Sequence, residues 1–278
     1  MVTEVDATLT LRDRTVAITA ERRHAEQAGL FTARGATVVS APTMHTIDLS
    51  TDAVLRRHTE SVIADPPDIL VATTGFGMRL WFDAAASWGL LDRLLAALAS
   101  TSAIARGPKA RSALRQRDLD VAWQAPNESM DEVVAHLTAR PDVASASVVV
   151  QLFDDADHPS SAALGAHVAD LRLVTVYRWE PPLDPAPVHD LIDAIIAGQV
   201  DAVTFTSQPA VRFLVDLAGD RAAELVAACN DGRCLPVCIG PVCARAGDDV
   251  GITTMVWPDP YRLVPMVKLV EQELAAPT

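Results

Sequence analysis

Two short stretches of this 278-residue chain combine an apolar run with hydroxyl side chains. The first is Asp68 to Arg79 (DILVATTGFGMR), and the second is Asp201 to Arg212 (DAVTFTSQPAVR). In each, a strand-like run leads into a turn with hydroxyl and backbone N–H donors, followed by a helix, and the second turn adds the amide of Gln208. Helix starts of this kind favour anions such as carboxylates, so each turn is a candidate binding site. The alternative is that these Thr and Ser residues only cap the helices that follow.

A second pair of turns has the same spacing as the first pair. Asp201 follows Asp68 by 133 residues, and Gly240-Pro241-Val242 follows Gly107-Pro108-Lys109 by the same 133. Two landmarks with one separation indicate an internal duplication. Four donor-rich turns in two copies favour a shared ligand cleft over four unrelated caps. The candidate binding residues are therefore Thr73, Thr74, Gly75, Gly107, Pro108, Lys109, Thr206, Ser207, Gln208, Gly240 and Pro241.

The elements around these turns read as alternating strands and helices. An apolar strand is predicted over 69–72 and a β-branched one over 146–152. A helix over 160–170 and a strand over 173–177 follow. This order matches that of residues 16–42, where a helix is predicted over 21–34. This order predicts an α/β fold with two similar parallel-sheet domains. Ligands bind such sheets at the carboxyl ends of the strands, where the four turns would lie.

Two segments look like crossings between the domains. Residues 42–49 begin with proline and show no helical period, and residues 179–187 form the densest proline run of the chain. Proline-rich segments of this kind are extended.

Charge and composition exclude several classes of function. The net charge of −13 disfavours binding of this chain alone to nucleic acid or to an anionic membrane. The N-terminus lacks the apolar core of a signal peptide, and no apolar run is long enough to cross a bilayer, so a cytoplasmic protein is expected.

Common cofactor and catalytic motifs are also missing. There is no GxGxxG, GxxxxGK[ST], GxSxG or HExxH sequence. The four cysteines form no CxxC pair and the seven histidines lack metal-like spacing, so neither a metal nor a cofactor is expected. The cysteines are predicted to be small buried hydrophobic residues.

Three stretches resemble uroporphyrinogen-III synthase: DAVTFTSQPAVRFL, PVCIGPVCARAGDDVGI and, between the two copies, VTVYRWEPP. Their order and spacing extend the similarity over nearly the whole chain. The resemblance implies two α/β domains joined by a two-stranded antiparallel β-ladder, with the first βαβ segment packed into the C-terminal domain. Residues 1–45 and 179–278 would then form one domain and residues 46–178 the other.

The resemblance also implies a reaction. It is the cyclisation of the linear tetrapyrrole hydroxymethylbilane, with inversion of ring D and loss of water, by a monomer without a cofactor. The family's favoured assisting tyrosine matches Tyr177, and Ser129 joins the binding residues above. The substrate carries eight carboxylates, which suits donor-rich turns on an acidic protein.

Two turns differ from the family pattern and keep a second hypothesis open. The first strand ends in Thr19-Ala20-Glu21 where a Thr-Arg-Pro-like turn is usual, and Gln151 to Asp154 replaces Arg-Gly-Glu. A synthase-like sensor that binds a tetrapyrrole without converting it is therefore the alternative to an enzyme. A generic two-domain binder resembling periplasmic proteins is a third interpretation, but it would need a secretion signal.

Overall fold

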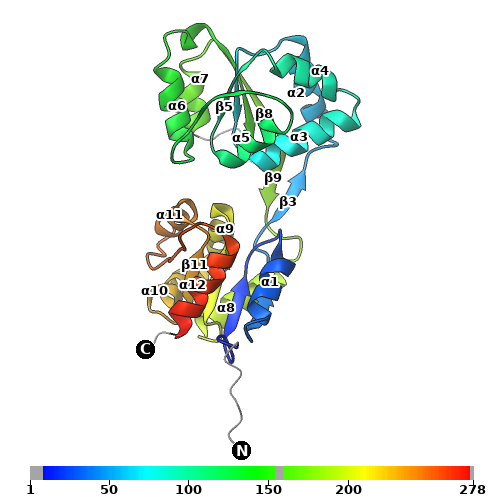
Figure 1. The fold of residues 1–278 in the computed structure, drawn as a ribbon. Coiled ribbons are helices and arrows are strands. Elements are labelled where there is room, and N and C mark those ends of the chain that lie inside the picture. Colours follow the sequence, from blue (N-terminus) through cyan, green and yellow to red (C-terminus); the bar gives the residue numbers. More distant parts are fainter. Residues whose placement is uncertain (1–8, 154–158, 276–278) are drawn as a thin grey trace, which may run out of the picture. The chain divides into compact units, whose positions relative to one another are not determined.

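The computed structural model describes residues 9–153 and 159–275. The chain divides into two compact units. Residues 46–179 form the central unit, and residues 1–45 with 180–278 form the terminal unit (Figure 1). No helix of the described residues is long and apolar enough to cross a membrane.

The central unit is built on a five-stranded parallel sheet in the order β6-β5-β4-β7-β8. Its strands are β4 (Ile69–Ala72), β5 (Ser102–Ala105), β6 (Val121–Gln124), β7 (Ser147–Leu152) and β8 (Asp170–Thr175). Its helices are α2 (Ala53–Ala64), α3 (Gly75–Ser87), α4 (Leu91–Leu98), α5 (Pro108–Arg115), α6 (Met130–Thr138) and α7 (Pro159–Gly165), with a 3-10 turn η1 (Val143–Ser145).

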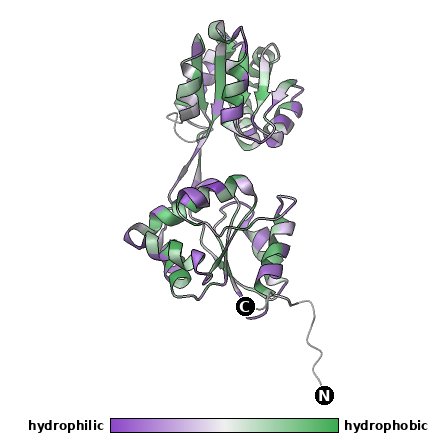
Figure 2. Ribbon diagram, turned by 90° about the vertical axis from the view of Figure 1, so that its left-hand side faces the viewer, coloured by the Kyte–Doolittle hydropathy of each residue, from purple (hydrophilic) through white to green (hydrophobic). Residues whose placement is uncertain are grey.

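Strand β4 lies in the middle of this sheet because all four of its side chains are apolar and buried. Leu70 and Ala72 pack in one core cluster with Trp81 of α3, and Ile69 and Val71 pack in another with Val133 of α6. Alternate side chains of a strand point to opposite faces, so both faces of the sheet are covered by helices. Figure 2 shows this pattern as hydrophobic strands among helices that are part hydrophobic and part hydrophilic.

The terminal unit repeats this plan with a four-stranded parallel sheet in the order β11-β10-β1-β2. Its strands are β1 (Thr15–Ile18), β2 (Thr37–Ser40), β10 (Ala202–Phe205) and β11 (Leu235–Cys238). Its helices are α1 (His24–Thr32), α8 (Ala186–Ile196), α9 (Gln208–Ala218), α10 (Ala222–Asn230), α11 (Pro241–Asp249) and α12 (Leu263–Ala275), with a 3-10 turn η2 (Gly219–Arg221). Strand β1 pairs with β10, so the first βαβ segment completes the C-terminal sheet as expected.

The duplication is visible element by element. Strands β10 and β11 begin 133 residues after β4 and β5, and helices α11 and α12 begin 133 after α5 and α6. The isolated parallel bridge from Val237 to Val256 reproduces the pairing of Ile104 with Trp123 at the same separation. One ancestral sheet plan thus accounts for both units.

A two-stranded antiparallel sheet of β3 (His45–Asp48) and β9 (Tyr177–Glu180) contains both points at which the chain passes between the units. The predicted fold class, with two parallel-sheet α/β domains and a β-ladder, is therefore confirmed.

Some predicted boundaries are wrong. The helix predicted over 160–170 ends at Gly165, and β8 already begins at Asp170. Pairing with β7 from Ser147 to Leu152 holds 170–175 extended, so a long-range partner overrides the local helical pattern. The helix expected from Glu21 begins at His24, because Arg23 adopts a left-handed backbone (φ 57°).

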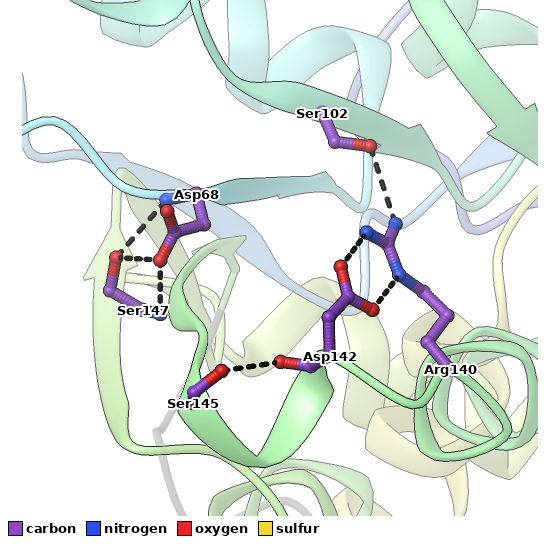
Figure 3. A network of polar contacts seen from close by, with 6 residues as sticks. All are labelled: Asp68, Ser102, Arg140, Asp142, Ser145 and Ser147. Carbon is purple, nitrogen blue, oxygen red and sulfur yellow. Dashed lines mark hydrogen bonds and ion pairs between the residues drawn. The ribbon is translucent and has the colours of Figure 1, made fainter.

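The amino ends of the central strands are tied by a polar network on the edge opposite the candidate turns (Figure 3). The carboxylate of Asp68 accepts hydrogen bonds from the main-chain N–H and the hydroxyl of Ser147, at 2.8 and 2.9 Å. Nearby, Arg140 pairs with Asp142 at 2.7 Å and donates to the hydroxyl of Ser102 at 3.4 Å. In the terminal unit, the carboxylate of Asp201 accepts from the N–H of Thr15 at 2.7 Å.

Replacing Asp68 with asparagine is expected to lower the melting temperature at neutral pH. The hydrogen bonds from Ser147 lower the pKa of Asp68 below its usual value. A carboxyl with a lowered folded-state pKa stabilises the fold above its unfolded pKa of about 3.9, and the contribution is lost as pH falls through the folded value. Thermal melts at pH 7 and pH 3 check this, with exposed Asp120→Asn as the control. An equal loss at both pH values would contradict it.

Candidate functional site

The turn after β4 is fixed by its neighbour β7. The hydroxyl of Thr73 donates to the main-chain oxygen of Gln151 at 2.7 Å, and the N–H of Thr74 donates to the Gln151 side-chain oxygen at 3.1 Å. The Thr74 hydroxyl accepts from the N–H of Gly77 at 3.0 Å and so caps α3. Gln151, the first residue of the altered Gln151 to Asp154 turn, is fully buried. Here that position holds the turn in place.

The turns at 73–75 and 107–109 approach each other closely at Gly75. A Cβ atom at Gly75 would lie 2.1 Å from the main-chain oxygen of Lys109, a separation that no real contact allows. A Cβ at Gly107 would lie 2.9 Å from a carboxylate oxygen of Glu128. The starts of α3 and α5 therefore touch through backbone, while the side chains of Pro108 and Lys109 are exposed.

Tyr177 lies at this same turn. The residue is only 2% exposed, and its hydroxyl donates to the hydroxyl oxygen of Thr74 at 3.4 Å, which is long for such a bond. Its ring meets Phe76 edge-on at 5.0 Å and is stacked on Phe153 at 5.8 Å between centroids. The structure thus places the candidate catalytic phenol next to a candidate binding residue.

Arg106, Phe153 and Trp179 complete an aromatic and cationic cluster that the sequence interpretation missed. Trp179 packs on Phe153 at 4.8 Å, and the guanidinium carbon of Arg106 lies 5.5 Å from the Phe153 centroid, within cation–π range. Burial lowers the pKa of Arg106, although the nearby Tyr177 and Glu128 raise it. The sequence does hold a signal for these two residues. Arg106 follows β5 and Phe153 follows β7, and these two strands flank β4.

Ser129 has a structural contact that accounts for its position. Its hydroxyl accepts from the N–H of Asp131 at 3.1 Å and, with Glu132, forms a capping box at the start of α6.

The terminal unit carries the matching turns. Thr206, Ser207 and Gln208 are half-buried at the start of α9, with Ser207 at the N-cap. Unlike Thr74, Ser207 makes no capping bond, and its oxygen is shielded from solvent without a hydrogen-bond partner among the described residues. Gly240 lies against the exposed Tyr261, whose ring carbon would be 3.1 Å from a Cβ there, and Pro241 opens α11. Helices α9 and α11 pack together as α3 and α5 do.

Thr19, which follows the first strand of this unit, also contacts a neighbouring strand. Thr19 is fully buried, and its hydroxyl donates to the main-chain oxygen of Thr204 at 2.8 Å. The hydroxyl of Thr204 in turn accepts from the Gln27 amide at 2.8 Å. The altered turns at Thr19 and Gln151 therefore both bind a neighbouring strand end.

The four cysteines, Cys229, Cys234, Cys238 and Cys243, are buried, as predicted, and none forms a disulfide among the described residues. Burial raises the pKa of Cys229 to about 12 and so keeps this thiol protonated. Among the described residues no cluster of His, Cys, Asp or Glu could hold a metal ion.

Comparisons with known proteins agree over most of the chain. A family model described as Uroporphyrinogen-III synthase HemD matches residues 25–268. A mutant uroporphyrinogen III synthase of Thermus thermophilus is similar in structure, with a TM-score of 0.77, 26% identity and coverage of 94% of this chain and 98% of that one. An uncharacterised protein of Bacillus subtilis is 29% identical over 92% of this chain and 94% of its own length. A putative uroporphyrinogen-III synthase of Methanothermobacter thermautotrophicus is 37% identical over 36% of this chain and 38% of its own.

Proposed function

Since the chain belongs to the uroporphyrinogen-III synthase family, we propose that it cyclises hydroxymethylbilane to uroporphyrinogen III, with inversion of ring D and loss of water, in tetrapyrrole biosynthesis. We further propose that the protein is a lyase and that it acts as a monomer in the cytoplasm. The observation that carries it is the Tyr177 phenol, which lies at the Thr74 turn of the family fold.

The proposed role of Tyr177 is to donate a hydrogen bond to the hydroxyl that leaves the substrate. As the C–O bond breaks, the proton of the phenol moves to the departing oxygen, which leaves as water, and the positive charge stays on the pyrrole chain as an azafulvenium ion. The far pyrrole then attacks through a spiro intermediate, which rearranges and closes the ring, and the proton released from the pyrrole carbon returns to the phenolate. The phenol now donates to Thr74 over a long 3.4 Å, so it can exchange this acceptor for the substrate at little cost.

The proposed binding residues hold the substrate's carboxylates and its conformation. Thr73, Thr74, Gly75, Gly107, Pro108, Lys109 and Ser129 belong to the central unit, and Thr206, Ser207, Gln208, Gly240 and Pro241 belong to the terminal unit. The shielded Ser207 hydroxyl supports this role, because a buried donor without a partner is costly and a ligand oxygen would satisfy it. Unassisted closure gives the type I isomer, so the protein's contribution is chiefly orientation.

A product assay tests the proposal. The protein is incubated with hydroxymethylbilane, the products are oxidised to porphyrins, and the type I and type III isomers are separated. The enzyme hypothesis predicts type III, and formation of type I alone would contradict it.

A tetrapyrrole sensor is the second candidate, and the altered turns at Thr19 and Gln151 are the observation that favours it. Hydroxymethylbilane or uroporphyrin would raise the melting temperature of a sensor. The sensor would form no type III isomer, so hydroxymethylbilane would still close to the type I product. The two candidates therefore differ in the isomer formed, whereas both predict binding.

A further inference from the structure

An open groove of about 470 Å³ lies on the central unit beside α5 and the end of β6. It is lined by Pro108, Arg111, Ser112, Arg115, Gln116 and Gln124. This lining offers two guanidinium groups, two amides and a hydroxyl, and it contains no acidic residue. Such a set of donors is suited to an anion.

Among residues 9–153 and 159–275, the two arginines of this groove have no partner of opposite charge. Arg111 and Arg115 are four residues apart on α5, so both face the same side of the helix. Within the part of the chain that the structure describes, neither side chain makes an ion pair, whereas the neighbouring Arg117 pairs with Asp83. Like charges at this spacing repel, and a bound anion would turn that repulsion into attraction.

One nitrogen of Arg111 lacks the partner that it needs. Its Nε atom is shielded from water and has no hydrogen-bond acceptor among the described residues. Shielded donors in proteins normally have an acceptor. After a small rotation of this half-exposed side chain, a carboxylate in the groove could accept from Nε and a terminal nitrogen together, which is the geometry that arginine favours.

The duplication shows that these cations are not needed to build the fold. Residues 106–115 read RGPKARSALR, and the matching residues 239–248 of the terminal unit read IGPVCARAGD. Both segments form the same strand end, turn and helix. Ala244 and Asp248 stand where Arg111 and Arg115 lie in the central unit. The basic groove is thus confined to one copy, in a chain whose net charge is −13.

We propose that this groove binds carboxylate groups of a polyanionic ligand, with Arg111 and Arg115 as the cationic ligands and Gln124 as an added hydrogen-bond donor. The groove begins at Pro108, next to the turn that packs on Gly75. The identification of the carboxylates as those of a tetrapyrrole rests on the proposed function. The binding of carboxylates in the groove is independent of that function, because a sensor without catalytic activity would keep the groove.

A charge-matched pair of variants tests the groove. Arg111→Gln/Arg115→Gln removes both groove cations, and Arg57→Gln/Arg93→Gln removes two exposed cations from α2 and α4 of the same unit. Binding of uroporphyrin, with eight carboxylates, and of tricarballylate, with three, is measured by calorimetry at low and at physiological salt. We expect the groove variant to weaken binding about tenfold or more, and the control about twofold or less, with a smaller difference at higher salt.

The two probes distinguish the sources of the carboxylate. If the groove variant loses affinity for uroporphyrin alone, the groove is assigned to a tetrapyrrole. If it also loses affinity for tricarballylate, the groove is assigned to carboxylates in general. Wild-type protein that binds neither probe, or a groove variant that binds both as tightly as the control variant, would overturn the proposal. If the wild-type protein makes only the type I isomer, the proposed function is refuted. If the groove variant nevertheless loses probe binding, the proposal that the groove binds carboxylates still holds.

Discussion

Replacing Tyr177 with phenylalanine is expected to lower the rate of type III formation by on the order of 10²-fold, the lower end of what a positioned proton donor contributes. The change removes only the hydroxyl. The ring contacts with Phe76, Phe153 and Trp179 remain, and the hydrogen bond from Tyr177 to Thr74, which the change removes, is a long one. The melting temperature should therefore stay nearly constant while turnover falls. Steady-state kinetics with hydroxymethylbilane and a thermal melt measure the two effects.

The only other tyrosine of the chain supplies the control for this variant. Tyr261 is 57% exposed, and Tyr261→Phe keeps its ring beside Gly240 while removing the same hydroxyl group. We expect unchanged turnover for this control. Equal rates for Tyr177→Phe and wild type would remove Tyr177 from the mechanism.

Replacing Gly75 with alanine is expected to destabilise the central unit by about 1–3 kcal/mol, the usual cost of overpacking. The added Cβ would meet the main-chain oxygen of Lys109 at 2.1 Å and its carbonyl carbon at 2.6 Å. These are backbone atoms, so no side-chain rotation can relieve the clash. The turns at 73–75 and 107–109 must separate, and binding of the tetrapyrrole should weaken along with stability.

Gly29→Ala is the matched control for this change. Nothing lies within 4 Å of a Cβ at Gly29, which is inside α1, so alanine there should be neutral or stabilising by up to about 1 kcal/mol. Denaturant melts are followed by tryptophan fluorescence and by circular dichroism. Trp81, Trp88, Trp123 and Trp179 report the central unit, and the helical signal also reports the terminal unit, which contains Gly29. A Gly75→Ala variant as stable as wild type would show that the close approach is not required.

The duplicated plan of the fold could be predicted from the sequence because both copies keep their turns at one separation. Buried strands such as Ile69–Ala72 are apolar throughout, and glycine or proline marks the helix starts that follow them. The end of the helix near Gly165 could not be predicted, since it depends on the pairing of β8 with β7, a contact that local sequence does not encode.

The candidate site was predictable where it depends on backbone turns and not where it depends on side-chain direction. Thr74 and Tyr177, two of the predicted site residues, lie together, and Arg106 and Phe153 join them because β5 and β7 flank β4 in register. Gln151 looks like the loss of a basic residue in the sequence. In the structure its amide holds the Thr74 turn, which the sequence alone does not reveal.

The isomer ratio as a function of protein concentration tests the central claim most directly. Hydroxymethylbilane closes spontaneously to the type I product, so an enzyme must compete with that reaction. At fixed substrate, we predict that the type III fraction rises with the concentration of wild-type protein until it accounts for nearly all product, and that Tyr177→Phe needs on the order of 10²-fold more protein to reach the same fraction. A product that remains type I at every protein concentration would contradict the assignment of this chain as a uroporphyrinogen-III synthase.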